Sequence, residues 1–168
     1  VCLASPLRDV YKRQLLACAE EWLDLDALAA GRGSDAASGL RGLLGWQESA
    51  RLDEVAPETI TVPSGSRIRV DYPEPGSDTS PVLAVKLQEC FGWTDGPTVC
   101  DGRVRVVLHL LSPARRPLAV TDDLASFWAS VYPAVRVENR GRYSKHPWPE
   151  DPMTATPTKR TNRALRGN

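Results

Sequence analysis

The stretch RVRVVLHLLSPARRPLAVTDDLASFW, from Arg103 to Trp128, decides how this chain folds. Apolar residues alternate along its first part, as they do in a strand with one buried face: Val104, Val106, Leu108 and Leu110. Turn residues at 112–116 then lead into a short return strand over 117–120. The pattern therefore predicts two paired strands near 103–120.

A helix is expected directly after these strands, over 122–140. Thr121 can cap its start, and Asp122 and Asp123 suit the positive end of the helix dipole. Apolar side chains then follow at the spacing of one helix face: Leu124, Phe127, Trp128 and Val131. Pro133 is expected to kink or restart the helix.

The preceding chain predicts both helices and strands. Helices are expected near 15–30 and 40–55, the second weakened by Gly42 and Gly45. A β-hairpin is expected near 59–72, where Ile68, Val70 and Tyr72 alternate with charged residues. Residues 81–91 are predicted to form a helix that starts at Pro81, although the run VLAV (82–85) also fits a strand.

These elements predict an α+β fold, a small antiparallel sheet packed with helices and followed by an irregular basic tail. One core is expected to contain Ile68, Val70, Val106, Leu108, Phe127 and Trp128. We divide the chain into a lead-in (1–14), a helical segment (15–56), an α+β domain (57–143) and a Pro-rich basic tail (144–168). The lead-in resembles a translated sequencing adapter and is left out of the fold.

Composition is that of a globular protein, with 42% hydrophobic and 25% charged residues. Formal net charge is zero, but residues 1–60 hold 6 Lys/Arg against 10 Asp/Glu, which leaves 15 against 11 for residues 61–168. No apolar run is long enough to span a bilayer, and we expect a cytoplasmic protein. The chain begins with Val1, so we expect it to be the end of a longer protein.

Catalytic machinery is not expected in this chain. The Gly-rich stretch 31–45 contains no Lys, which a phosphate-binding loop requires. The four cysteines lack the spacing of a zinc site and are expected to be reduced. His109 is interpreted as an edge-facing or hydrogen-bonded core residue, and His146 has no orienting partner nearby in sequence. We therefore predict neither catalytic residues nor metal ligands.

Basic residues concentrate near the C-terminus, where Tyr143 and Trp148 lie among them. Cations neutralise phosphates and aromatic rings stack on bases, so this composition indicates a nucleic-acid surface, although a solvated tail fits it equally well. The candidate binding residues are Arg136, Arg140, Arg142, Lys145, Lys159, Arg160 and Arg163, with Arg166 in the same stretch. A second basic group carries the same ambiguity: Arg103, Arg105, Arg115 and Arg116.

Five stretches resemble the C-terminal end of the HrpB family of bacterial DEAH-box ATP-dependent RNA helicases. In chain order they are VPSGSRIRVDY (62–72), LAVKLQECFG (83–92), VVLHLLSPARRPLAVTDDLASFW (106–128), RGRYSKHPWPEDP (140–152) and TPTKRT (156–161). The resemblance is continuous from about Leu40 to Arg163. Departures from the family pattern are Ser144, Arg115, Pro133 and Thr156.

The resemblance implies a non-catalytic accessory domain behind a helicase motor, with ATP and Mg bound in that motor and not in this chain. One hypothesis is that the domain contacts RNA or regulates the motor. The alternative is a protein–protein docking module for the helicase core in cis or another partner. Docking predicts that Trp128 or Trp148 lies exposed on an apolar patch, and burial of both counts against it.

Overall fold

The computed structural model describes residues 13–31, 35–74 and 77–166, so most of the lead-in lies outside them. The chain divides into two compact units. The first runs to Glu54 and includes Glu74–Asp78; the second contains Val55–Pro73 and Thr79–Asn168. Each unit is considered separately below.

The first unit contains short helices where two longer ones were expected. In place of one helix near 15–30 the structure has helical residues 13–17, then α2 (Ala19–Trp22) and α3 (Leu25–Ala29). Helices α2 and α3 are separated at Leu23, whose backbone is extended. The Asp24 carboxylate then accepts a hydrogen bond from the Ala27 N–H at 2.8 Å. Because Asp favours helix starts over helix interiors, Asp24 begins a new helix here.

The helix expected near 40–55 is also divided, into α4 (Ala36–Gly42) and α5 (Trp46–Val55). Asp35 caps α4 by accepting from the Ser38 N–H at 3.1 Å, so this helix begins four residues before the predicted start at 40. Gly39 lets α4 approach α2 closely, since a Cβ at this position would collide with the Trp22 carbonyl oxygen. Helix α5 ends before Pro57, as expected.

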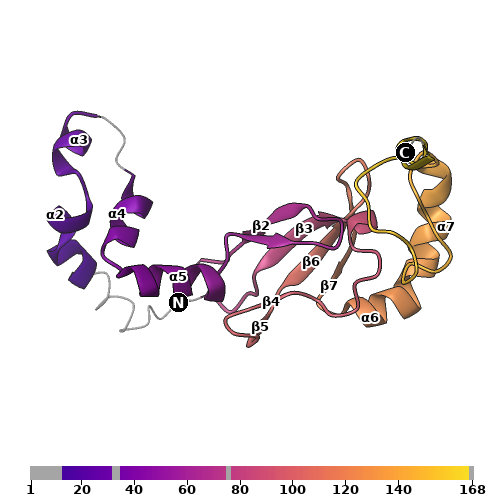
Figure 1. The fold of residues 1–168 in the computed structure, drawn as a ribbon, viewed down its shortest axis with the longest axis horizontal. Helices are drawn as coiled ribbons and strands as arrows, with labels where there is room; N and C mark the ends of the chain where they lie inside the picture. The colour runs from indigo at the N-terminus through magenta and orange to yellow at the C-terminus, as the bar shows by residue number, and fades with distance from the viewer. Residues whose placement is uncertain (1–12, 32–34, 75–76, 167–168) are drawn as a thin grey trace, which may run out of the picture. The chain divides into compact units, whose positions relative to one another are not determined.

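The second unit is built on a five-stranded sheet in the order β1-β2-β3-β6-β7 (Figure 1). Its strands are β1 (Thr59–Thr61), β2 (Arg67–Asp71), β3 (Val82–Lys86), β6 (Val107–Leu111) and β7 (Pro117–Thr121). A separate two-stranded sheet joins β4 (Thr98–Val99) to β5 (Val104–Arg105). The α+β class is confirmed, but the large sheet is mixed and not purely antiparallel, because β3 and β6 run parallel.

Strand β3 corrects the prediction of a helix over 81–91. The segment pairs with β2 on one side and β6 on the other, and only the 3₁₀ turn η1 (Leu87–Glu89) follows it. Its burial alternates, with Leu83 and Val85 inside and Ala84 exposed. A short apolar run has no decisive local preference, so pairing with distant strands determines its structure. The connection through β4 and β5 returns the chain to the same end of the sheet, which parallel pairing requires.

Both predicted hairpins are present. In the first, Ile60 lies opposite Ile68, and Gly65 turns the chain with φ +80°. In the second, β6 and β7 are antiparallel, and the turn is closed by the Ser112 N–H, which donates to the Arg116 carbonyl at 2.8 Å. The strand expected over 103–111 is interrupted at Val106, which is fully buried between β5 and β6.

The helix expected over 122–140 is a continuous but irregular helical segment. It comprises α6 (Leu124–Ser126), the π-helical turn η2 (Phe127–Val131) and α7 (Tyr132–Arg142). Asp123 caps it instead of Thr121, accepting from the Ser126 N–H at 3.0 Å. Pro133 has no N–H for the preceding turn, and the Tyr132 N–H donates five residues back to Phe127. The restart predicted at Pro133 is therefore a π-bulge.

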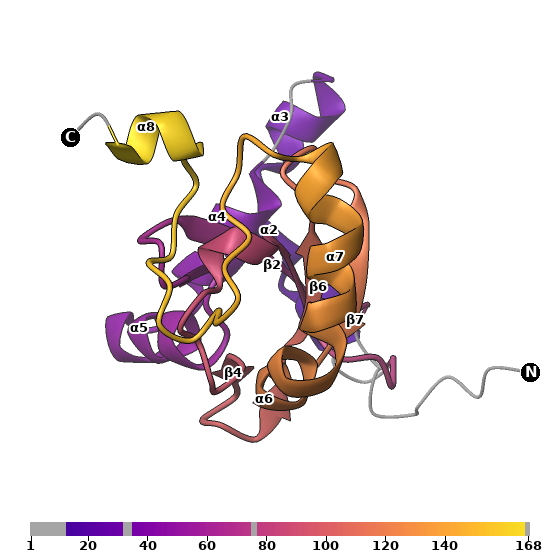
Figure 2. The same cartoon turned by 90° about the vertical axis from the view of Figure 1, so that its right-hand side faces the viewer.

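The core lies between the sheet and these helices. Val70, Val106, Leu108, Phe127 and Trp128 are at most 6% exposed, and half-buried Ile68 packs against them. Helices α6 and α7 and the C-terminal segment with α8 (Asn162–Arg166) gather at one end of the sheet (Figures 1 and 2). Unlike the core face, the opposite sheet surface is solvent-accessible.

We call this surface the open face. Cross-strand partners point to the same side, so the strand registers define its members. Each member is half-buried or exposed, whereas Leu83, Val85, Leu108 and Leu110 on the core side are at most 1% exposed. The open face consists of Thr59, Thr61, Arg67, Arg69, Asp71, Val82, Ala84, Lys86, Val107, His109, Leu111 and Val120.

Candidate nucleic-acid interface

The segment after α7 is held on the domain by hydrogen bonds to its backbone. The Tyr132 hydroxyl donates to the Pro149 carbonyl at 2.8 Å, and Arg136 Nε donates to the Trp148 carbonyl at 2.9 Å. Further along, the Thr158 N–H donates to the Gln88 carbonyl at 2.9 Å, and Gln88 Nε2 donates to the Arg160 carbonyl at 3.3 Å. Basic side chains from 140 to 163 are therefore presented on a fixed backbone.

Asn162 brings two parts of this segment together. Its backbone N–H donates to the Lys145 carbonyl at 2.8 Å. Its side-chain amide donates to the carbonyls of Ser144 at 3.3 Å and His146 at 3.1 Å. These bonds join the start of α8 to the turn that follows α7. As a result, the predicted residues Lys145 and Arg163 line one hollow although they are far apart in sequence.

We call this feature the tail hollow. Its volume is about 530 Å³, and its lining residues are Ser144, Lys145, Thr161, Asn162 and Arg163. Both charged side chains in the lining are cations, and the remaining lining residues can donate hydrogen bonds through a hydroxyl or an amide. Cations with neutral donors and no lining carboxylate suit a phosphate group.

The other predicted residues of the C-terminal region have different surroundings. Arg140 and Arg142 are exposed in the last turn of α7, which leads into the tail hollow. Lys159 and Arg160 are also exposed. The Arg136 side chain is only 20% exposed and pairs with Glu150 at 3.1 Å. Arg136 therefore fixes the tail to α7, a structural contact that the sequence did not indicate. The side chain of Arg166 lies outside the described residues.

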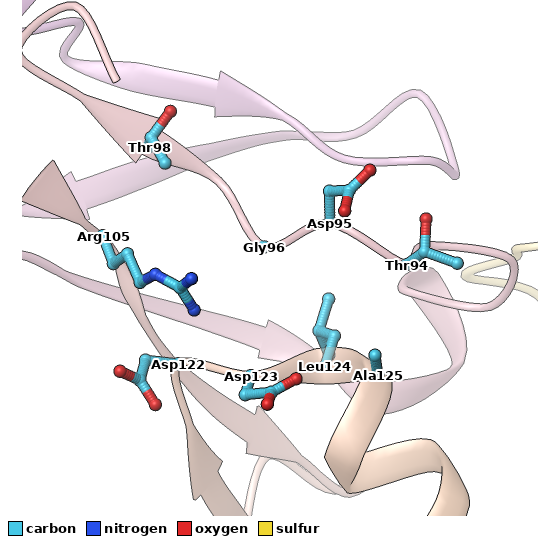
Figure 3. A pocket seen from close by; sticks show the side chains of 9 residues that line it. All are labelled: Thr94, Asp95, Gly96, Thr98, Arg105, Asp122, Asp123, Leu124 and Ala125. Atoms are coloured by element: carbon cyan, nitrogen blue, oxygen red, sulfur yellow. The ribbon is translucent and has the colours of Figure 1, made fainter. Parts of the chain in front are cut away.

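Two residues of the second basic group, Arg103 and Arg105, lie near carboxylates. Arg103 Nη2 lies 3.3 Å from an Asp101 oxygen. Arg105 lines a hollow of about 330 Å³ together with Asp95, Asp122 and Asp123. Figure 3 shows its guanidinium directed toward the loop that carries Asp122 and Asp123. Carboxylates in the same hollow offset the attraction of Arg105 for a phosphate, and Asp101 does the same for Arg103. We therefore do not count Arg103 and Arg105 as part of the phosphate-binding surface around the tail hollow.

His146 lies beside the tail hollow with its Nδ1 atom buried and without a hydrogen-bond partner among the described residues. Burial lowers the pKa of His146, and the positive charge of Lys86 lowers it further. Gln88, two residues after Lys86, binds the backbone of the tail at Thr158 and Arg160, so this end of β3 lies near the tail. At neutral pH the ring is therefore neutral, and the positive charge of the site comes from lysine and arginine.

Residues that could support other chemistry are separated from one another. Among residues 13–31, 35–74 and 77–166, no three His, Cys, Asp or Glu side chains are grouped to hold a metal ion. Burial raises the pKa of the Cys90 thiol well above its ordinary value, so this thiol is a poor nucleophile. Within the same described ranges, the helices are too short or too polar to cross a membrane.

Sequence reasoning missed Asn162, whose side-chain amide binds two carbonyls and whose main-chain N–H binds a third, because such contacts have no sequence signature. It also assigned no binding role to Arg67, Arg69 or Lys86, which share the open face of the sheet. The charged outer side of the first hairpin was visible in the sequence alone. Its continuation onto β3 and β6 depends on the strand order, which only the structure supplies.

Comparison with known proteins identifies similar chains. Residues 18–152 match a family described as HrpB_C, ATP-dependent helicase C-terminal. The ATP-dependent RNA helicase HrpB of Escherichia coli K12 is 47% identical over 159 residues, which cover 92% of this chain and 19% of that protein. The chain thus spans about a fifth of the length of this relative.

Two solved structures are also similar. The crystal structure of the E. coli DExH-box NTPase HrpB superimposes with a TM-score of 0.78 at 47% identity, covering 89% of this chain and 19% of that one. A structure described as the Escherichia coli DEAH/RHA helicase HrpB gives a TM-score of 0.61 at 43% identity. It covers 81% of this chain and 17% of that one.

Proposed function

Because this chain belongs to the HrpB family and matches its ATP-dependent helicase C-terminal region, we propose that its tail hollow contacts the RNA on which the parent helicase acts. The observation that carries the proposal is the Asn162 contact to the turn after α7, which places Lys145 and Arg163 on one hollow. A disordered basic tail would have no such contact. Preorganised cations lose less conformational entropy on binding than mobile ones.

The proposed role is non-catalytic. ATP and Mg would be bound by the remainder of the helicase, and this domain would hold RNA near the motor or regulate it. Lys145 and Arg163 would contact phosphates, and Arg140, Arg142, Lys159 and Arg160 would add electrostatic attraction from the surrounding surface. Phosphate contacts of this kind position RNA without reading its sequence. The corresponding location is the cytoplasm.

Filter binding of the whole chain to single-stranded RNA between about 50 and 200 mM salt tests the proposal. Affinity should fall steadily as salt rises. In the double variant K145Q/R163Q, the slope of log affinity against log salt should decrease by roughly 1.4, since each single-strand phosphate contact contributes about 0.7. The matched control R103Q/R105Q removes the same charge beside carboxylates and should keep the slope of the unmodified chain.

The Asn162→Ala variant provides a second test of the same proposal in the filter-binding experiment. This variant removes no charge but releases α8 from the turn at 144–146. Affinity should therefore fall several-fold at every salt concentration while the number of ions released stays nearly constant. The proposal is wrong if the unmodified chain has no affinity at low salt, if its affinity is independent of salt, or if K145Q/R163Q binds like the control.

The docking alternative is supported by different residues from those expected. Trp128 is 6% exposed, and Trp148 is half-buried against the core with its Nε1 donating to the Tyr143 carbonyl at 3.2 Å. Neither therefore provides an exposed aromatic anchor. Trp46 at the start of α5 is 79% exposed, and Leu16 in the same unit is 70% exposed. We propose the remaining length of the helicase chain, about four-fifths of the relative, as the occupant of this surface.

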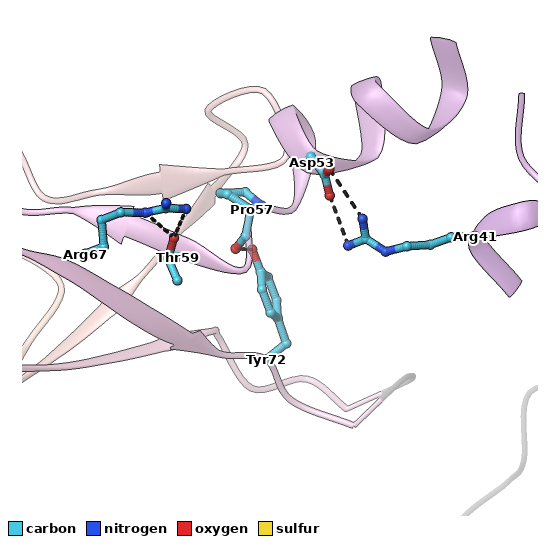
Figure 4. Close-up of polar contacts among 6 residues, drawn as sticks. All are labelled: Arg41, Asp53, Pro57, Thr59, Arg67 and Tyr72. Atoms are coloured by element: carbon cyan, nitrogen blue, oxygen red, sulfur yellow. Dashed lines mark hydrogen bonds and ion pairs between the residues drawn. The ribbon is translucent and has the colours of Figure 1, made fainter. Parts of the chain in front are cut away.

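A Trp46→Ala variant tests this second role. Because Trp46 is exposed and the Arg41–Asp53 ion pair at 3.1 Å joins α4 to α5 without it (Figure 4), the isolated chain should keep its unfolding midpoint. The complete helicase carrying the same substitution should unfold at lower temperature. An unchanged melting curve in the complete helicase would remove the support for docking.

A further inference from the structure

The open face carries more positive than negative charge. Arg67 and Arg69 lie on β2 and Lys86 lies at the end of β3, whereas Asp71 is the acidic member of the face. Both arginines are exposed. Arg67 donates from Nε and Nη2 to the Thr59 hydroxyl at 3.2 and 2.9 Å, which holds its guanidinium along the face (Figure 4). A preorganised cation of this kind suits a phosphate oxygen.

The middle of the open face is less polar. His109 on β6 lies between Ala84 on β3 and Val120 on β7, which are its cross-strand partners. Val120 is 61% exposed. Val82 on β3 and Val107 on β6, which are cross-strand partners two residues before Ala84 and His109, are half-buried. An imidazole ring flanked by small aliphatic side chains can pack against the face of a nucleobase. His109 was expected to be edge-facing or a hydrogen-bonded core residue, but it lies half-buried on the open face of β6, a strand paired on both sides.

The end of β3 connects the open face to the tail segment. Lys86 is two residues before Gln88, whose side chain donates to the Arg160 carbonyl. The end of β3 that carries Lys86 is therefore the end of the sheet to which the tail segment is bound. The face spans three strand intervals from β2 to β7, about 14 Å at the usual strand spacing.

We infer that the open face of the sheet binds single-stranded RNA, with Arg67, Arg69 and Lys86 on phosphates and His109 against a base. The strand continues from there into the tail hollow, so the inference rests on the RNA contact proposed above. A single strand is favoured over a duplex because its bases are available to the aliphatic centre, whereas a duplex presents mainly phosphates and sugars. Four-stranded sheets of RNA-binding modules hold two or three bases in this way.

Fluorescence anisotropy with a labelled oligouridylate of about twelve nucleotides tests the inference on the full 168-residue chain. The variant R67Q/R69Q should weaken binding about tenfold at low salt and reduce the salt slope by roughly 1.4. Arg69→Gln alone leaves the Arg67–Thr59 contact intact and should reduce the slope by about 0.7. His109→Ala should weaken binding, because it removes the ring that packs against a base.

The variants K145Q/R163Q and R103Q/R105Q are measured in parallel. If K145Q/R163Q loses affinity while R67Q/R69Q binds like the control R103Q/R105Q, the open face is not an RNA surface, although the proposed function stands. If both R67Q/R69Q and K145Q/R163Q bind like the unmodified chain, both proposals are wrong. Competition by polyglutamate or by duplex RNA as strong as that by oligouridylate would also overturn the assignment to single strands.

Discussion

Trp128 links several segments of the second unit through one side chain. Its ring lies 5.0 Å from Phe127, 5.4 Å from Tyr132 and 6.2 Å from Phe91, measured between ring centroids. Its Nε1 donates to the Trp93 carbonyl at 2.8 Å. Aromatic rings at these distances stabilise each other beyond the area they bury. Truncating Trp128 therefore removes packing from both the helical segment and the loop after η1.

The Trp128→Ala variant should lose about 3–5 kcal/mol of unfolding free energy, the usual cost of emptying a large aromatic site. Denaturant melting of the full chain measures the loss. Trp46→Ala is the matched control, because its exposed ring should contribute less than about 0.5 kcal/mol. A loss below about 1 kcal/mol for Trp128→Ala would show that the ring is not packed in the core.

His146 should make stability depend on pH. In the folded chain the pKa of His146 lies below its ordinary 6.5, first because the ring is buried and second because Lys86 is nearby. The unfolded chain takes up a proton near 6.5 and the folded chain resists it, so acid favours unfolding. The stability is present in full above pH 6.5 and is lost as the pH falls from 6.5 toward the folded pKa.

His146→Gln provides the comparison, because glutamine does not titrate. Thermal melting in steps from about pH 8 to pH 5 should show a smaller drop in melting temperature for the variant than for the unmodified chain. Identical pH profiles would mean that His146 is not shielded from protonation in the folded state.

Strand β3 shows where local sequence ceases to determine an element. The hairpins at 59–72 and 107–121 were predictable, since alternation and turn residues specify each of them within a few positions. Residues 82–86 fit a helix and a strand equally well, and a helix was predicted. Pairing with β6, more than twenty residues further along the chain, settles the outcome. Such long-range pairing leaves no trace in the local pattern.

Ala84→Pro tests the central position of β3. Proline cannot donate to a ladder, and this strand is paired on both sides, so the variant should lose more than about 2 kcal/mol of unfolding free energy. Ala84→Thr should change stability by less than about 0.5 kcal/mol, since the side chain is exposed and Thr suits a strand. Equal melting curves for the two variants would contradict central pairing.

The helical elements show a related limit. Asp24 and Gly45 interrupt predicted helices through local hydrogen bonding and backbone freedom, effects that a periodicity argument does not include. Pro133 was recognised as a disturbance, but the π-bulge that accommodates it needs the whole turn from Phe127 to Tyr132. The apolar spacing nevertheless predicted that Leu124, Phe127 and Trp128 face the core. It was wrong for Val131, which was expected on the same helix face and is 43% exposed.

At the scale of the whole molecule, sequence composition indicated a basic surface without showing how it is assembled. Lys145 and Arg163 line one hollow because Asn162 connects their segments. Arg136, in contrast, forms an ion pair with Glu150 and a hydrogen bond to the tail backbone. Arg103 and Arg105 lie beside carboxylates from other loops. Charge counted along the chain cannot separate these cases, because each depends on which distant residues become neighbours.

The central proposal is that this C-terminal domain of the HrpB family offers RNA one surface that runs from the open face to the tail hollow. Photo-crosslinking of 4-thiouridine RNA to the full chain, with the attachment sites mapped by mass spectrometry, tests this claim most directly. The account predicts crosslinks on the peptides that carry His109 and Lys145, both suppressed by high salt. Crosslinks confined to residues 13–54, or to the loops that carry Arg103 and Asp122, would contradict it.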